Sequence, residues 1–242
     1  MLLKNGKEPY FVLQPGDARQ ELLCELLRGD GYTACFIEEK SDLRGAYIIA
    51  PAASAELRAR AETAGARVLA YAGREDYLLG NAEITAECAI CLAIERSRAV
   101  LCGSRTAVMG GGRIGRLLAV KLRALGACVT AYARRSETRR ELAALGVAAE
   151  DIAAADDALP QADIVFNTVP AMVLPEERLR LLPRGALVLD LASRPGGTDF
   201  AAAERLGINC VHALALPGRL APLSAAREIR AAVYNMIKEG DF

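Results

Sequence analysis

Apolar and polar positions along the C-terminal half of the chain fall into short runs and helical repeats. Residues 104–109, S-R-T-A-V-M, read as a short buried strand that ends in apolar residues. The next apolar positions recur at helical spacing, and another apolar run covers residues 127–133. The helical positions are Ile114, Leu117, Leu118, Leu122 and Leu125. This pattern predicts a strand, a helix and a second strand within about thirty residues, the length of a compact dinucleotide-binding unit.

A glycine-rich turn joins the first strand to the helix. Residues 110–115 read G-G-G-R-I-G, which is a G-x-G-x-x-G motif. Gly110 permits a tight turn, Gly112 lets the backbone approach a pyrophosphate, and Gly115 lets the helix pack closely on the strand. The free N–H groups of the helix N-terminus favour phosphate. Because the motif follows a strand and opens an amphipathic helix, it predicts a dinucleotide site; a glycine turn without function is the alternative.

The end of the second strand indicates which dinucleotide binds. NAD sites usually place an acid about 20 residues beyond the glycines to bind the ribose 2′-hydroxyl. No acid lies between Gly115 and Ser136, and the segment ends in Arg134-Arg135-Ser136. Two guanidinium groups and a hydroxyl suit a 2′-phosphate, so NADP(H) is favoured over NAD(H); a solvated basic turn is the alternative. The expected cofactor-binding residues are Gly110, Gly112, Arg113, Ile114, Gly115, Arg134, Arg135, Ser136, Thr168 and Pro170.

The rest of the chain alternates between strand and helix patterns, which predicts an α/β fold with parallel sheets. Residues 71–81 read as irregular and residues 82–98 as a long helix. Ser54 and Ser224 are expected to cap helices, and Asp199 to cap another. The expected strands are 11–13, 32–37, 46–50, 67–70, 162–167, 186–191 and 209–213.

The order of these elements predicts two domains. Residues 1–81 form a small parallel α/β substrate domain, and residues 82–100 form a linking helix. Residues 101–222 form a Rossmann NADP-binding domain. The last segment, 223–242, is expected to be a helix that packs back on the first domain.

Composition narrows the classes of function. Charged residues make up 25% of the 242 residues and cancel to a net charge of +0, which gives no electrostatic footprint for nucleic acid or an anionic membrane. No apolar run reaches the ~18 residues of a membrane span, and the N-terminus lacks the pattern of a signal peptide. The odd count of 7 Cys predicts buried thiols in a reducing cytosol. Cys88 and Cys91 are expected to be core residues, and no metal site is expected.

Several segments together resemble the A chain of dipicolinate synthase, a Rossmann-type protein. The resemblance runs from residue 11 to residue 238, although the N-terminal half is shorter than is usual in that family. The run D-L-A-S-R-P-G-G-T-D-F at 190–200 is its most specific part. Matching segments also occur at 16–20, 110–115, 167–170, 216–218 and 221–222. Asn81 fits the family's pattern as well, together with Thr85 and Glu87 on the long helix.

The resemblance implies a role in sporulation, in the last step to dipicolinate. Dihydrodipicolinate, a cyclic dicarboxylate, would lose a hydride to NADP⁺ and a proton to a base or water. The resemblance also implies a partner, the flavoprotein-like subunit of dipicolinate synthase, which is required alongside this chain in the family. A heteromeric complex in the mother-cell cytoplasm of a spore-forming bacterium is therefore expected, with a homo-oligomer also possible.

A dicarboxylate substrate is expected to be bound by cationic side chains, one for each carboxylate. Arg19 and Arg194 are therefore the expected clamps, with Ser193 and Thr85 as further substrate-binding residues and Arg194 also in a catalytic role. Glu87 is the only acid inside an apolar helical run, so burial could make it the catalytic base. The alternatives are an ordinary surface arginine for Arg19 and an ion-paired helix-face glutamate for Glu87.

Two other functions remain open at this stage. One is a dehydrogenase of the 2-hydroxyacid or shikimate type, which normally uses a catalytic His or Lys. The single His212 lies on an apolar strand, where a satisfied core residue is expected, and no Lys occurs between residues 41 and 120. The other is a non-catalytic protein that binds a dinucleotide and positions its partner.

Overall fold

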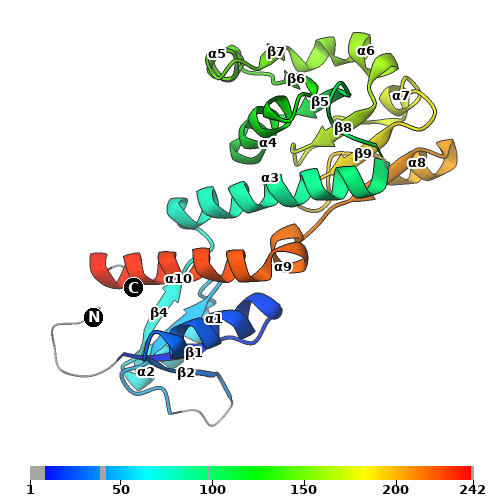
Figure 1. Ribbon diagram of the computed structural model, residues 1–242. Coiled ribbons are helices and arrows are strands. Elements are labelled where there is room, and N and C mark those ends of the chain that lie inside the picture. Colours follow the sequence, from blue (N-terminus) through cyan, green and yellow to red (C-terminus); the bar gives the residue numbers. More distant parts are fainter. Residues whose placement is uncertain (1–8, 39–41, 98, 241–242) are drawn as a thin grey trace. The chain divides into compact units, whose positions relative to one another are not determined.

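The computed structural model describes residues 9–38, 42–97 and 99–240 (Figure 1). The chain divides into two compact units. The first unit comprises Met1–Ile84 together with Pro217–Phe242, and the second unit comprises Thr85–Leu216. Both are built on parallel sheets, as the alternation of strand and helix patterns predicts.

The first unit is a parallel sheet of four strands in the order β2-β1-β3-β4. Its strands are β1 (Tyr10–Leu13), β2 (Thr33–Phe36), β3 (Tyr47–Ala50) and β4 (Arg67–Ala70). Its helices include α1 (Ala18–Gly29), α2 (Ala55–Ala64), the short α9 (Leu216–Leu220) and α10 (Pro222–Glu239). The packing of α10 into this unit confirms the expected return of the terminal helix.

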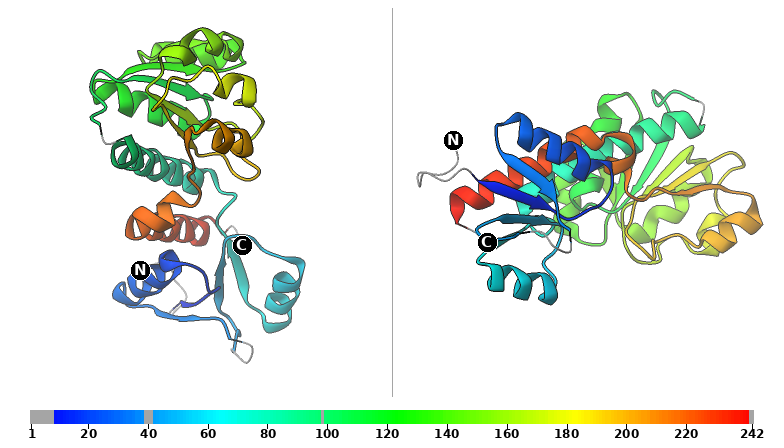
Figure 2. Two further views of the ribbon diagram at one scale, coloured as in Figure 1. Left: turned by 90° about the vertical axis from the view of Figure 1, so that its right-hand side faces the viewer. Right: turned by 90° about the horizontal axis from the view of Figure 1, so that it is seen from below.

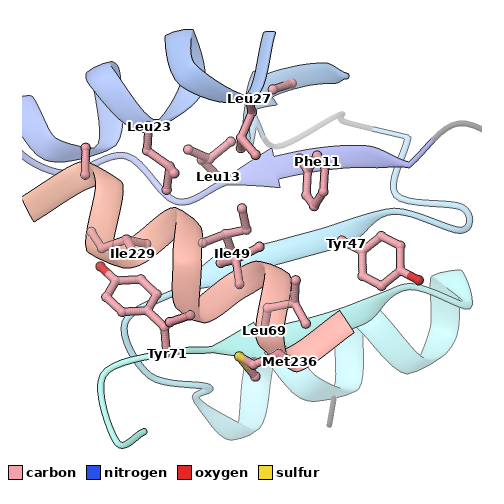
Figure 3. Packing of buried hydrophobic residues seen from close by; sticks show 14 of the residues in the cluster. Phe11, Leu13, Leu23, Leu27, Tyr47, Ile49, Leu69, Tyr71, Ile229 and Met236 are labelled. Atoms are coloured by element: carbon pink, nitrogen blue, oxygen red, sulfur yellow. The ribbon is translucent and has the colours of Figure 1, made fainter. Parts of the chain in front are cut away.

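One face of this sheet is covered jointly by α1 and α10. Apolar side chains of the strands, such as Leu13 and Ile49, meet Leu23 from α1 and Ile229 from α10 (Figure 3). All four side chains are 2% exposed or less. Continuous burial of this kind explains why short β-branched and aromatic runs in the N-terminal half form strands. The other face packs on α2 through Leu57 and Ala61.

Local capping chemistry sets the helix starts in the first unit. Ser54 caps α2 by accepting from the backbone N–H of Leu57 at 3.1 Å, as expected. The expected cap at Ser224 is wrong, because α10 already begins at Pro222 with Ala221 as its N-cap. Proline suits the first helical turn, where its missing N–H would have no intrahelical partner.

Helix α3 (Glu75–Ser97) begins earlier than the sequence pattern predicts. Residues 75–81, expected to be irregular, are helical. Gly80 and Asn81 are residues that often end a helix. Here Gly80 has a tertiary reason to be glycine, because a Cβ at this position would overlap the carboxylate of Glu228 on α10. The length and composition of α3 would allow a membrane span, yet half of its apolar window is buried within the protein, as in an ordinary core helix.

The second unit is a parallel sheet of six strands in the order β10-β9-β8-β5-β6-β7, which is the doubly wound Rossmann arrangement. Helices cover both faces (Figure 2). The strands are β5 (Arg105–Met109), β6 (Cys128–Tyr132), β7 (Ala148–Glu150), β8 (Ile164–Asn167), β9 (Leu187–Asp190) and β10 (Asn209–His212). The helices are α4 (Arg113–Ala124), α5 (Ser136–Ala144), η1 (Ile152–Ala154), α6 (Ala155–Ala158), η2 (Leu159–Gln161), α7 (Glu176–Leu179) and α8 (Phe200–Leu206).

The thiols are less buried than their apolar surroundings suggest. Cys24 and Cys88 are buried, but Cys91, Cys102 and Cys128 are exposed, so the expectation of buried thiols is wrong for these three. Cys91 lies on the outward face of α3, three residues after the buried Cys88. A helix of apolar composition can therefore still present one of its thiols to solvent.

Candidate functional site

A hollow of about 360 Å³ lies where β5, β6 and β8 end in the second unit. The carboxyl ends of parallel strands are where ligands bind in doubly wound folds. The hollow brings together six of the residues that the sequence assigns to the cofactor: Gly110, Gly112, Arg134, Arg135, Thr168 and Pro170. The other lining residues are Gly111, Arg116, Tyr132, Ala133, Thr138, Ile152 and Val169.

The glycines of the turn have the geometry that their spacing predicts. Gly110 has a φ of +106°, and a Cβ there would overlap the hydroxyl of Thr168. A Cβ at Gly115 would overlap the carbonyl oxygen of Gly110, so α4 can approach the turn only with glycine at this position. At Gly112, by contrast, no described atom lies within 4 Å of the Cβ position. The open side of the turn thus leaves room for a phosphate group beside the N-terminus of α4.

Thr168 closes the side of the hollow formed by β8. Its backbone N–H and its hydroxyl both donate to the carbonyl of Met109, at 2.8 Å and 2.9 Å. These two bonds fix the exit of β8 against the exit of β5. The hydroxyl then packs beneath Gly110, which explains why that turn admits no side chain.

The rim of the hollow next to β6 is cationic. Arg134 and Arg135 follow β6 directly and are exposed, and Ser136 begins α5. Arg135 makes only a 3.3 Å exposed ion pair with Glu137, and Arg134 forms no ion pair within the described part of the chain. No acidic side chain among the described residues lines the hollow. Two guanidinium groups are therefore available to an anion at this edge.

Two arginines that the sequence reasoning missed hold the hollow in shape. Arg116 lines it, donates from Nε to the carbonyl of Gly111 at 2.8 Å and pairs with Glu141 on α5. Arg139 donates from Nη1 to the carbonyls of Ala133 and Arg134, each at 2.7 Å. The spacing of Arg116, one turn after Arg113 on the opening helix, was an available signal. For Arg139 there was none, because its partners, two backbone carbonyls and the carboxylate of Asp151 at 2.7 Å, come together only in the folded sheet.

The exit of β9 is organised around a fully buried carboxylate. Asp190, which is 0% exposed, accepts from the backbone N–H of Ala192 at 3.0 Å and from that of Gly197 at 2.8 Å. Between them, residues 193–195 are exposed, Ser193 and Arg194 among them, and Gly196 is buried. Here the structure places two expected substrate residues together on a firmly anchored turn.

Two side chains beside this loop hydrogen-bond to backbone groups. Asp199 caps α8 by accepting from the N–H of Ala202 at 2.9 Å, as expected. Asn167, also 0% exposed, both donates to and accepts from the backbone of Val169. Thr198 is buried, and its hydroxyl has no hydrogen-bond partner among the described residues.

Glu87 does not have the surroundings expected for it. Its side chain is 67% exposed and accepts from Lys121 Nζ at 2.9 Å. The expected burial is therefore wrong: α3 presents this position to solvent and to a lysine of α4 instead of the core. Thr85, two residues earlier on α3, is buried.

Arg19 belongs to the first unit and already has a carboxylate partner. Its Nε and Nη2 atoms donate to Asp17, with the shortest distance at 2.8 Å. The guanidinium group lowers the pKa of Asp17, which also caps α1 through the N–H of Arg19. Nearby, burial raises the pKa of Tyr71 to about 12, and its hydroxyl accepts from Gln20. The guanidinium group of Arg19 is thus held in place by Asp17, and part of its hydrogen-bonding capacity is already used within the chain.

Comparison with known proteins agrees with this geometry. Residues 93–194 match the family model for the NAD-binding domain of D-isomer specific 2-hydroxyacid dehydrogenases. A curated relative, the A chain of dipicolinate synthase from Bacillus subtilis (strain 168), is 36% identical over 166 residues, covering 69% of this chain and 56% of the relative. This protein is a homologue of the A chain of dipicolinate synthase. The resemblance noted in the sequence is thereby confirmed.

Two crystal structures of the A chain of dipicolinate synthase extend the likeness to the whole fold. The Bacillus halodurans protein superposes with a TM-score of 0.81 at 26% identity, covering 95% of this chain and 97% of its own. The Bacillus subtilis protein gives 0.82 at 25%, covering 96% and 97%. A transhydrogenase from Sinorhizobium meliloti, at 18% identity and a TM-score of 0.65, shares the fold alone. The two-sheet architecture is thus that of dipicolinate synthase, and its second unit carries the dinucleotide-binding domain of the dehydrogenases.

Proposed function

We propose that this chain is an NADP-dependent oxidoreductase that oxidises dihydrodipicolinate to dipicolinate together with the flavoprotein-like subunit of dipicolinate synthase. The observation that carries the cofactor choice is the cationic rim formed by Arg134 and Arg135 beside an open glycine turn, where none of the described lining residues is acidic. Homology to dipicolinate synthase supports the substrate and the partner. The role in sporulation and the mother-cell cytoplasm are part of the same proposal.

The described residues fit a phosphorylated dinucleotide in several respects. The turn at Gly112 is open, so its N–H and those of Arg113 and Ile114 at the start of α4 could hold the pyrophosphate. Arg134, Arg135 and Ser136 would hold the 2′-phosphate, because planar guanidinium groups make paired bonds to phosphate oxygens. When bound, NADP⁺ supplies the hydride acceptor.

In the second unit, Ser193 and Arg194 would bind the substrate and orient its ring. Arg194, exposed on the loop anchored by Asp190, would bind one carboxylate of the ring, and Ser193 would add a hydrogen bond. Arg19 of the first unit and the buried Thr85 stay proposed contacts. The ring carbon would give up a hydride and the ring a proton, which leaves an aromatic pyridine. Because Glu87 is exposed and ion-paired, we assign the proton to solvent water.

The first test is a fluorescence titration of the full chain with NADPH and with NADH. We expect tighter binding of NADPH. In Arg134→Ala/Arg135→Ala that preference should fall by roughly a hundredfold or more, since hydrogen bonds to charged groups contribute about 1.5–3 kcal/mol each and the charges of two arginines are removed. The matched control is Arg140→Ala/Arg184→Ala, which removes two exposed arginines outside the hollow. Equal binding of both nucleotides by the unaltered protein would contradict the assignment of NADP.

A non-catalytic role, in which the chain only binds a dinucleotide, is favoured by one observation. The carboxylate of Glu87 and the guanidinium of Arg19 both have partners within the chain, Lys121 and Asp17. Turnover of the complex with the flavoprotein-like subunit should separate the two functions. Loss of turnover in Arg194→Ala with NADPH binding retained would support catalysis on this chain, whereas unchanged turnover would support the binding role.

A further inference from the structure

His212 lies where it can control the loop that carries Arg194. It is the last residue of β10 and pairs in register with Asp190, the last residue of β9. Its ring Nε2 lies 3.2 Å from the carbonyl oxygen of Ala192. A carbonyl can only accept, so the imidazole must donate from Nε2.

The loop between Ala192 and Gly197 is held at both ends. The N–H of Ala192 is bound by Asp190 and its C=O by His212, so both polar groups of this residue are engaged. At the far end, the N–H of Gly197 is bound by the other oxygen of Asp190. The N–H of Gly196 closes a turn on the carbonyl of Ser193 at 2.9 Å. Residues 193–195, which lie between these anchors, are exposed.

The imidazole itself is oriented by stacking. The rings of His212 and Phe200 lie 4.7 Å apart with an interplanar angle of 25°. A Cβ built on Gly196 would lie 3.3 Å from Asp190 Oδ2 and 3.4 Å from His212 Nε2, so the carboxylate and the imidazole converge beneath this glycine. The ring is therefore fixed against the loop by aromatic packing as well as by its hydrogen bond.

We propose that His212 is a positioning residue for Arg194. By fixing the carbonyl of Ala192 together with Asp190, it holds the loop so that the Arg194 guanidinium is preorganised for a carboxylate of the substrate. This inference rests on the proposed function for the identity of that substrate. The orientation of the loop does not depend on it.

Two substitutions separate the hydrogen bond from the packing. His212→Phe keeps a ring that can stack on Phe200 but removes the donor. His212→Gln replaces the ring with an amide whose N–H can lie near the place of Nε2. We expect His212→Phe to weaken binding of dipicolinate to the full chain by about fivefold, the effect of one hydrogen bond. We expect His212→Gln to recover most of this loss and NADPH binding to stay unchanged in both.

The decisive comparison uses the Arg194→Ala background. If His212 acts through Arg194, His212→Phe adds no further loss there. An equal loss in both backgrounds, or none in the unaltered protein, would overturn the inference. Where turnover is measured with the flavoprotein-like subunit, the change should fall on KM more than on kcat, which general destabilisation would not produce.

Hydrogen exchange of the backbone amides of Ser193, Arg194, Gly196 and Gly197 tests the loop without any substrate. Exchange should be faster in His212→Phe than in the unaltered protein and nearly normal in His212→Gln. Unchanged exchange in His212→Phe would overturn the positioning role. If instead the unaltered protein fails to bind dipicolinate while this exchange pattern holds, the proposed substrate is wrong and the positioning role stands.

Discussion

Gly115 lies so close to the carbonyl oxygen of Gly110 that no side chain fits between them. Gly115→Ala should therefore push α4 away from the turn. We expect a loss of about 1–3 kcal/mol in unfolding free energy, the usual cost of overpacking, and weaker NADPH binding. Urea unfolding and the fluorescence titration measure the two effects.

Gly112→Ala is the matched control for that change. The position is open and its φ is −73°, which alanine adopts freely. Stability should change by less than about 0.5 kcal/mol, as for an exposed site, while NADPH binding weakens because a methyl group enters the phosphate position. A stable Gly112→Ala protein with normal binding would show that no phosphate approaches this turn.

Glu87→Gln should have little effect on stability. The carboxylate is 67% exposed, and an exposed ion pair such as that with Lys121 contributes about 0–1 kcal/mol. We also expect turnover of the complex to change by no more than about threefold, the size of an exposed electrostatic effect. A fall of a hundredfold or more at constant substrate KM would instead restore Glu87 as the catalytic base.

The ion pair between Asp17 and Arg19 should make stability depend on acid pH. Because Arg19 lowers the folded-state pKa of Asp17, the stabilisation is present above the unfolded pKa, about 3.9. It is lost as pH falls through the lower folded-state pKa. Asp17→Asn can still cap α1, so it isolates the charge. We expect the mutant to be about 0.5–1 kcal/mol less stable at pH 7, as for a partly exposed pair.

Unfolding of both proteins by urea between pH 2 and pH 7 would test this expectation. The difference in unfolding free energy should shrink towards zero as Asp17 is protonated at the acid end. A difference that stays constant over the whole range would mean that the hydrogen-bond geometry of Asp17, not its charge, stabilises the start of α1.

Asp190→Ala should be strongly destabilising. The carboxylate is 0% exposed and satisfies two backbone N–H groups that would otherwise be buried without partners. The expected loss is about 2–4 kcal/mol by urea unfolding, from two unsatisfied donors. Asp199→Asn, which keeps the cap of α8, provides the control and should lose less than about 1 kcal/mol. Similar losses in both would contradict the central role of Asp190.

Local patterns were sufficient for most of the fold and for the glycine turn. The turn could be predicted because the spacing of its glycines is itself the signal, and the overlap of Gly115 with Gly110 lies within the motif. The start of α3 was missed because Gly80 contacts Glu228 on another helix, a tertiary relationship that no local pattern contains. The ion pair of Glu87 with Lys121 of α4 is likewise a contact between two helices, which the pattern of α3 alone does not contain.

Of the site, the sequence predicted residues that line the hollow and are expected to contact the cofactor, such as Arg134 and Thr168. Residues that support the site through backbone atoms were not predicted. Arg139 and His212 act on backbone carbonyls that become their partners only after the sheet has formed. Sequence reasoning assigned His212 to the core because its neighbours are apolar. The structure shows it half-buried, stacked on Phe200 and bound to the loop of Arg194.

In the loop after β9, the exposed residues are not the residues that anchor the loop. Asp190 binds the backbone on either side of residues 193–195 and makes no demand on their side chains. Ser193 and Arg194 can therefore be exchanged while the frame beneath them stays folded. If the proposed function holds, a preference for a different acid can arise by replacing these two residues, which makes them a compact target for redesign of specificity.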